Sequence, residues 1–308
     1  MVNLSFRCLP DTSAEQVDLF VAATPDPDRW RADLTGCFAE GSLHPEWCWQ
    51  AVDGAGTVRA CLYWWGRPGA AEPSTLIAMG RDDLAASVAL VQQSRDVMQL
   101  RSARVGLTIP NLDERSVEAV HPEYTALLAA TGFRRTVERV RLEWREEYGR
   151  PERRSRLSFV PARDRPEAEL ITVLTDVLDG TLDEAMRTGA ADVGVQAHAA
   201  QMLDDFLLYP GPSDWFALAL SEGVPVGYVI ASTMDAPDGI LAELGVARAH
   251  RGQGYAGELL AHGTELLAGA GFGLIRSDTD CANTPMRTAF AAGGYREFAR
   301  RFDYRWVR

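Results

Sequence analysis

A glycine-rich segment holds the residues whose types and spacing could do chemistry. The run Ala242–Leu260 reads AELGVARAHRGQGYAGELL: a strand pattern ends at Val246, a basic stretch follows, and glycines open a helical pattern at Gly254. Glycines let the backbone curl round a phosphate with several N–H groups pointing inward, and the positive end of the helix dipole adds to the attraction. The segment therefore predicts an anion site that suits a pyrophosphate.

The same glycines match the dinucleotide fingerprint GxGxxG, with Asp278 following further along the chain. In that fingerprint the first glycine follows its strand directly, whereas here Ala247–Arg251 intervenes. The chain after Gly257 is also too short to complete a doubly wound domain. The sequence therefore does not favour a dinucleotide at this site.

Composition excludes several other chemistries. All 31 basic residues are arginine, so no lysine is present for a Schiff base, a pyridoxal-phosphate anchor or a Walker-A loop. The formal net charge of −12 at pH 7 argues against nucleic acid or an anionic membrane as a partner, because both need net basic surface. The same acidity suits a cationic, amine-bearing substrate, although it also simply favours solubility.

The five cysteines are scattered and show no CxxC spacing, which predicts free thiols in a reducing cytoplasm and no metal site. We find no apolar run long enough to span a bilayer and no secretory-signal pattern at the N-terminus. We therefore expect a cytoplasmic protein.

The length suits two domains, and the sequence repeats itself. One spacing separates both Gly132 from Gly294 and Trp144 from Trp306, and alanines and arginines between them also coincide. A strand, glycine turn and second strand also occur in each half, as expected of an antiparallel hairpin. The charged stretch Glu146–Arg156, EEYGRPERRSR, reads as a linker. We infer a tandem duplication of one α/β domain.

The second copy is expected to contain elements in a definite order. They are strand 157–160, helix 167–178, helix 193–208, strands 215–220, 226–233 and 240–246, helix 255–268, strand 273–278, a helix from Thr284-Pro285 to Gly293-Gly294, and one or two strands over 296–306.

The glycine loop resembles the acyl-CoA loop of the GNAT superfamily of N-acyltransferases. That signature is Arg/Gln-x-x-Gly-x-Gly/Ala, and Arg251-Gly-Gln-Gly-Tyr-Ala256 fits it at every position. The strand that ends at Val246 is similar to the family's fourth strand. The later run with Asn283, Phe290 and Gly294-Tyr295 is similar to its second CoA-contacting helix and the Gly-aromatic pair that follows. The resemblance spans about residues 157–306.

This resemblance implies a mixed α/β (α+β) protein of two tandem GNAT-like domains, each a twisted mixed sheet flanked by helices. The expected division is a degenerate domain over 1–147, a linker over 148–156 and an acyl-CoA-binding domain over 157–308. The first half has Asp82 and Asp83 where its phosphate loop should be, and carboxylates there would repel a pyrophosphate. Tandem members such as mycothiol synthase share this plan, with one working half.

By resemblance, loop N–H groups would hold the pyrophosphate, and the strand before the loop would bond the pantetheine. The implied cofactor-binding residues are Leu244, Gly245, Val246, Arg251, Gly252, Gln253, Gly254, Tyr255, Ala256, Gly257, Asn283 and Phe290. Many members carry a proton-donating tyrosine at the position of Phe290. Another donor, or solvent, would therefore have to protonate the leaving thiolate in this chain.

Four carboxylates are candidates for the remaining chemistry. Glu243, on the strand that would carry the acyl group, is our first candidate for the general base, and Asp280 is a second catalytic candidate. Asp278 and Asp183 are expected to bind a cationic substrate. A solvated or hydrogen-bonding role remains an equal alternative for each of them.

The leading interpretation is an acetyl-CoA-dependent N-acetyltransferase that acts on a small amine-bearing metabolite by direct acyl transfer, without a metal, as a monomer or homodimer. A protein or peptide N-acetyltransferase would use the same chemistry with a wider cleft. A non-catalytic CoA-binding sensor or interaction module is the alternative from a different class, and Phe290 favours it.

Overall fold

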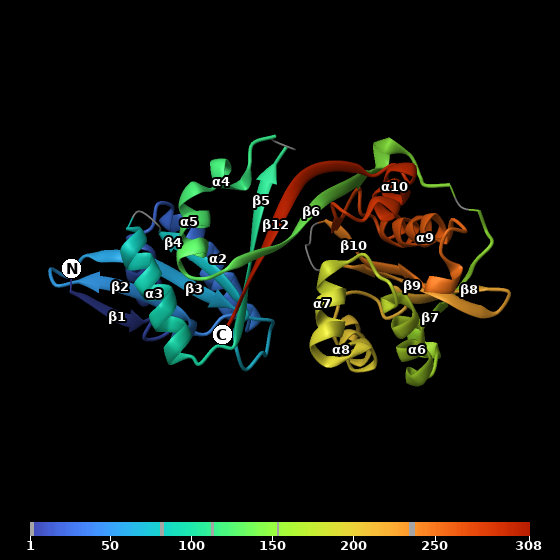
Figure 1. The fold of residues 1–308 in the computed structure, drawn as a ribbon. Helices are drawn as coiled ribbons and strands as arrows, with labels where there is room; N and C mark the ends of the chain where they lie inside the picture. The colour runs from blue at the N-terminus through green and yellow to red at the C-terminus, as the bar shows by residue number, and fades with distance from the viewer. Residues whose placement is uncertain (1–2, 81–82, 112–113, 153, 234–237) are drawn as a thin grey trace. The chain divides into compact units, whose positions relative to one another are not determined.

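A computed structural model of the chain describes residues 3–80, 83–111, 114–152, 154–233 and 238–308. Asp82 of the predicted first-half loop and residue 153 of the predicted linker lie outside these ranges. Two compact units are present (Figure 1). The first unit comprises the described residues of Met1–Ile109, Glu114–Val137 and Phe302–Arg308. The second unit comprises those of Pro110–Asp113 and Glu138–Arg301.

The first half of the chain runs through six strands and five helices over the described residues. In chain order they are β1 (Leu4–Cys8), α1 (Ala14–Val21), α2 (Pro27–Glu40), β2 (Cys48–Asp53), β3 (Val58–Trp65), β4 (Thr75–Gly80), α3 (Leu84–Val97), β5 (Ser102–Pro110), α4 (Val117–Val120), α5 (Pro122–Ala130) and β6 (Arg134–Arg145).

The second half repeats this alternation. Its elements are β7 (Ser158–Pro161), α6 (Glu167–Leu178), α7 (Glu184–Val193), α8 (Val195–Leu207), β8 (Phe216–Ser221), β9 (Val224–Ser232), β10 (Gly239–Val246), α9 (Tyr255–Gly269), β11 (Leu274–Asp280), α10 (Thr284–Ala292) and β12 (Arg296–Val307).

The strand topology of the two halves is the same, which agrees with the predicted duplication. In the first half β1, β2, β3 and β4 pair antiparallel in sequence, and β4 then pairs parallel with β5. In the second half β7, β8, β9 and β10 pair antiparallel, and β10 pairs parallel with β11. Both predicted hairpins, β2–β3 and β8–β9, are thus confirmed.

The closing strands are exchanged between the halves of the sequence. β6 pairs antiparallel with β11, so its residues from Glu138 onward belong to the second unit. The last residues of β12, from Phe302, belong to the first unit, where β12 neighbours β5 in the strand order. The chain therefore passes from the first unit to the second within β6, after Val137, whereas the expected linker covers residues 148–156.

The repeated glycines and tryptophans pack in matched pairs. A Cβ on Gly132 would lie 3.5 Å from Cδ1 of Trp306 in the first unit, and one on Gly294 would lie 3.9 Å from Cδ1 of Trp144 in the second. Both glycines have φ of +81°, a left-handed conformation that side chains disfavour. Each pair joins a helix–strand turn of one half to the closing strand of the other half.

Helices cover both faces of the sheet in the second unit (Figure 1). Residues of α6 and α8 pack with Phe216, Leu218 and Tyr228 on one face. Residues of α9 and α10 pack with Ala217 and Val229 on the other. Alternating side chains of β8 and β9 point to opposite faces, and burial of both faces explains why these strands are almost wholly apolar.

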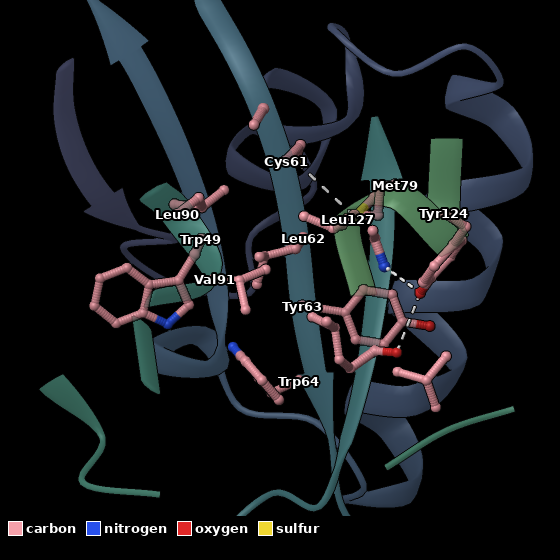
Figure 2. Packing of buried hydrophobic residues seen from close by; sticks show 14 of the residues in the cluster. Trp49, Cys61, Leu62, Tyr63, Trp64, Met79, Leu90, Val91, Tyr124 and Leu127 are labelled. Atoms are coloured by element: carbon pink, nitrogen blue, oxygen red, sulfur yellow. Dashed lines mark hydrogen bonds between the residues drawn. The ribbon is translucent and has the colours of Figure 1, made fainter. Parts of the chain in front are cut away.

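The buried hydrophobic residues of the first unit form one large core, which includes residues of β4 (Figure 2). Tyr124 of α5 reaches this strand, where its hydroxyl accepts a hydrogen bond from the amide of Ala78 at 3.0 Å and donates one to the carbonyl of Leu76 at 3.3 Å. Over the residues that the structure describes, β4 and β5 pair only at Thr75 and Arg104. The tyrosine thus fills the place where the two strands diverge.

The element order predicted for the second copy is confirmed except at one helix. α7 was not predicted: its ten residues include few large apolar side chains, and none of them is fully buried. The predicted linker begins with a single 3-10 turn, Glu146–Tyr148. No helix among the described residues is both long enough and apolar enough to cross a membrane.

Candidate active site

The second unit contains a cavity of about 670 Å³. β10 forms one wall and the start of α9 forms one end. Residues of β6, β11, α6, α10, the linker and the segment before α7 also line the cavity. Its volume lies in the range of small-molecule sites. All the residues that line it belong to the second unit.

The cavity begins where β10 and β11 separate. These parallel strands pair only at Gly239 and Ile240 of β10, and the hydroxyl of Ser277 then donates to the carbonyl of Leu241 at 2.9 Å. Beyond this point the β10 residues as far as Val246 face the cavity without a β11 partner in the described pairing. Unpaired main-chain groups on such an edge can hydrogen-bond an extended ligand.

The glycine loop leads from β10 to an open helix end. Arg248–His250 forms a 3-10 turn, and Gly252 and Gly254 adopt φ of +78° and +81°. Gly254 is the N-cap of α9, and no side chain caps the helix. The first turn of α9 lines the cavity, so its N–H groups and the positive end of its dipole are available to an anion.

The side chains of two arginines hold this loop in place by hydrogen bonds. The Arg251 guanidinium donates to the carbonyls of Val246, Gly180 and Val177 at 2.7–3.1 Å, which ties the loop to the end of α6. Arg156 donates to the carbonyl of Gln253 at 2.9 Å. The side chain of Arg251 therefore stabilises the conformation of the loop.

Arg156 also neutralises the one buried carboxylate in the first turn of α9. Its Nε lies 2.7 Å from Oε1 of Glu258, and Glu258 also accepts hydrogen bonds from the amides of Arg156 and Leu157. Glu258 is only 3% exposed, so without these partners its charge would oppose an anion at the helix end. The predicted linker therefore supplies a structural part of the loop.

Arg139 of β6 lies at the centre of the opposite, acidic end of the cavity. Its Nη1 is 2.8 Å from Asp278, its Nη2 is 3.1 Å from Asp183, and its Nε is 3.3 Å from Asp280. Arg301 approaches the other oxygen of Asp278 at 3.6 Å. Arg139 therefore contacts three carboxylates, and Arg301 also approaches one of them.

Glu243 lies on β10 beside that cluster. A β-bulge at Ala242 interrupts the pairing with β9, and bulges of this kind re-aim the neighbouring side chains. Burial, followed by the nearby carboxylate of Asp183, raises the pKa of Glu243 to about 8, against the opposing effects of Arg139 and a hydrogen bond from Tyr209. A carboxylate with a pKa close to neutral is well suited to take a proton.

Family and fold comparisons agree with this geometry. Residues 183–295 match the Acetyltransferase (GNAT) family. The second unit contains a GNAT acetyltransferase domain. Members of this family transfer acyl groups, so the domain is an acyltransferase. No curated protein matches the chain significantly by sequence.

Solved GNAT structures resemble nearly the whole chain. A GCN5-related N-acetyltransferase from Sphaerobacter thermophilus is 15% identical with a TM-score of 0.61, covering 99% of this chain and 95% of its own. A tandem GNAT protein from the clavulanic acid biosynthesis pathway is 17% identical with a TM-score of 0.58, covering 99% and 98%. At these identities the likeness concerns the fold, and the chain has two tandem GNAT-like domains.

The structure brings most of the predicted site residues of the GNAT domain into one cavity. Those that line it are Asp183, Glu243, Leu244, Gly245, Val246, Arg251, Gly252, Gly254, Tyr255, Ala256, Gly257, Asp278, Asn283 and Phe290. Gln253 and Asp280 do not line it. Gln253 instead presents its carbonyl to Arg156.

Asp280 is a structural carboxylate in this geometry. It is 2% exposed, and its Oδ2 accepts a hydrogen bond from the amide of Glu184 at 2.7 Å, at the start of α7. Burial raises the pKa of Asp280 above its ordinary value, although the hydrogen bond from Glu184 and the charge of Arg139 oppose this. We therefore do not retain Asp280 as a catalytic candidate.

α10, which the sequence predicts as the second CoA-contacting helix, carries an apolar side chain at its middle. Asn283 caps this helix by accepting a hydrogen bond from Met286, and Phe290 is 1% exposed against the ring of Tyr295. The hydroxyl of Tyr295 hydrogen-bonds that of Thr264 at 2.8 Å within the core. Tyr295 is thus a core aromatic, as its place after two glycines predicts.

Sequence reasoning missed Arg139 and Arg156. Arg139 was visible only as the repeat partner of Arg301, and Arg156 only as part of a charged linker. Among the described residues, no group of three or more His, Cys, Asp or Glu side chains is arranged to hold a metal ion.

Proposed function

We propose that the GNAT domain is an N-acetyltransferase that takes the acetyl group of acetyl-CoA and transfers it directly to the amine of a small metabolite. The observation that carries this proposal is the uncapped start of α9, with Gly254 left-handed, at one end of the cavity that holds Glu243. With a diphosphate at that helix end, a pantetheine arm would follow the unpaired edge of β10 toward Glu243.

The transfer itself needs few groups. The amine nitrogen attacks the thioester carbonyl, a C–N bond forms, and the C–S bond breaks to release CoA as a thiolate. The carboxylates of Asp183 and Asp278 attract the cationic acceptor, which loses one proton to solvent and becomes a neutral amine. Glu243 takes the second proton, which the nitrogen loses on its attack. Phe290 cannot donate a proton, so in our proposal solvent protonates the thiolate.

The first unit differs from the second at the positions where CoA would bind, and this supports the proposal that only one half is active. In place of an open helix end, the carboxylate of Asp83 caps α3 by accepting a hydrogen bond from Ala86 at 3.0 Å, and so occupies the position an anion would take. Tyr124 satisfies the main-chain groups of β4 that would otherwise face a pantetheine arm. We propose one CoA site per chain.

A CoA-binding sensor is the second candidate. The buried, apolar Phe290 favours it, because a sensor needs no proton donor. A protein or peptide acceptor would use the chemistry proposed for a small amine.

Two measurements on the full chain separate these candidates. We expect calorimetry to detect one CoA or acetyl-CoA per chain, and we expect a panel of mono- and polyamines to release thiol from acetyl-CoA. Binding without release by any amine would establish the sensor. No binding of either compound would overturn both proposals.

A further inference from the structure

Arg139 makes its contacts with a fixed geometry that few other side chains could provide. The three nitrogens of one planar guanidinium each lie within 3.3 Å of a different carboxylate, on Asp183, Asp278 and Asp280. Its side chain is only 16% exposed, and it lines the cavity. A guanidinium fork directs several hydrogen bonds at once, whereas an ammonium is a point charge.

We propose that Arg139 is the positioning residue of the acceptor end: it fixes the carboxylates of Asp183 and Asp278 beside the base Glu243 and offsets their negative charge. This inference rests on the proposed function, in which Glu243 is the base and the two aspartates attract the acceptor. Arg139 itself touches no reacting atom in this scheme.

The titratable groups around Glu243 come from several neighbouring elements. Asp183, before α7, and Asp278, on β11, oppose ionisation of Glu243, whereas Arg139, on β6, favours it. Tyr209, after α8, donates a hydrogen bond to Glu243. Tyr228, on β9, is fully buried beside Glu243, and its own pKa is raised well above the ordinary value. Arg139 is therefore the cation that counters two carboxylates at the base.

Removal of this cation has a predictable direction. Without Arg139, the two aspartates would oppose ionisation of Glu243 unchecked, and a larger share of the enzyme would carry a protonated base near pH 7. A nearby opposite charge shifts a carboxyl pKa by about 1–3 units. We expect kcat/KM of Arg139→Gln to fall roughly tenfold near pH 7 and to recover at alkaline pH.

Arg139→Lys separates charge from geometry. Lysine keeps the positive charge, so the pH profile should stay close to the native one. It cannot hold two aspartates with a rigid fork, so KM for the acceptor should rise while kcat changes little. A purely structural role for Arg139 would instead lower kcat/KM equally at every pH.

The direct test follows the titration of the Glu243 carboxyl carbon by ¹³C NMR in the full chain, with the signal assigned by its loss in Glu243→Gln. We expect a native midpoint near 8. We expect a midpoint higher by about 1 pH unit or more in Arg139→Gln, and one close to native in Arg139→Lys. Asp183→Asn should move it in the opposite direction. Arg145→Gln, on the same strand and paired with Glu143, is the matched control and should leave it unchanged.

An unshifted midpoint in folded Arg139→Gln, as judged by circular dichroism and CoA binding, would overturn the inference. If Arg139→Gln does not fold, an unshifted midpoint in Asp183→Asn overturns it, because the balance of charge would then not control the base. This readout does not depend on turnover. Absence of acyl transfer by the native chain would therefore refute the proposed function. It would not decide the titration result, which tests the role of Arg139 independently.

Discussion

The hydroxyl oxygen of Tyr124 lies 3.0 Å from the amide nitrogen of Ala78, in the first unit of the protein. The equivalent strand of the second unit, β10, leaves its edge open to a cavity, and the residue at the repeat position of Tyr124 is Met286, which lines that cavity. The two halves therefore share a splayed pair of parallel strands. One is filled by a side chain of the protein, and the other is available to a ligand.

Tyr124→Phe tests whether this hydroxyl is a structural part of the first unit. The substitution would leave the buried amide of Ala78 without its partner, so we expect a loss of about 1–3 kcal/mol in the free energy of unfolding. Urea denaturation measures it. Tyr148→Phe, whose ring stacks against Arg296 in the 3-10 turn after β6, is a control that should cost much less. CoA stoichiometry should remain one per chain, and a value of two in native protein would contradict a closed first site.

The element order was predictable because most strands and helices of the second copy bury one or both faces. Gly294 and Trp144 illustrate the limit: their repeat spacing revealed a duplication, but only the structure shows that the glycine of one half packs on the tryptophan of the other half. Strand exchange depends on long-range pairing, which leaves no mark on local periodicity. The boundary within β6 was missed for the same reason.

Gly254→Asp should remove CoA binding. The residue has φ of +81° and forms the N-cap of α9, so a carboxylate there would both strain the backbone and occupy the anion position with like charge. We expect the Kd for CoA, measured by calorimetry, to rise at least roughly a hundredfold, which is about 2.7 kcal/mol. Gly269→Ala, at the other end of the same helix and in open space, should bind CoA normally.

Glu243→Gln should lower kcat by a factor of about 10² to 10⁴, the usual contribution of a general base. In native protein the base must be ionised, so kcat/KM should rise as pH increases through about 8 and then level off. An acceptor amine that stays neutral over this range isolates the enzyme's own titration. Retention of the rising limb in Glu243→Gln would remove Glu243 from the mechanism, whereas Glu167→Gln, exposed on α6, should behave as native.

The same residue predicts a pH dependence of stability. Because folding raises the pKa of Glu243 from 4.5 to about 8, the folded state favours the protonated carboxyl, and this stability is lost as pH rises from below 4.5 through 8. Glutamine cannot ionise. We therefore expect the free energy of unfolding of Glu243→Gln to exceed the native value at pH 9 by about 2–4 kcal/mol and to approach it below pH 5. Equal stabilities at pH 9 would contradict the raised pKa.

The glycine loop was the most predictable part of the site. Its left-handed glycines and the open helix start that follows them form a short motif that can be recognised in the sequence alone. The acidic end was less predictable. Glu243 could be named from its strand, but nothing in the sequence indicates that Asp183, Asp278 and Asp280 all contact one arginine of β6. Neither spacing nor composition reports such a convergence, since these residues meet only after folding.

β6 carries a consequence for the history of this gene. The second unit takes its strand beside β11, and with it Arg139, from sequence that precedes the linker. A descendant trimmed to residues 157–308 would encode the glycine loop but neither that strand nor that arginine. The second unit therefore depends on sequence from both sides of the linker, and we expect β6 and the segment after the linker to be inherited together.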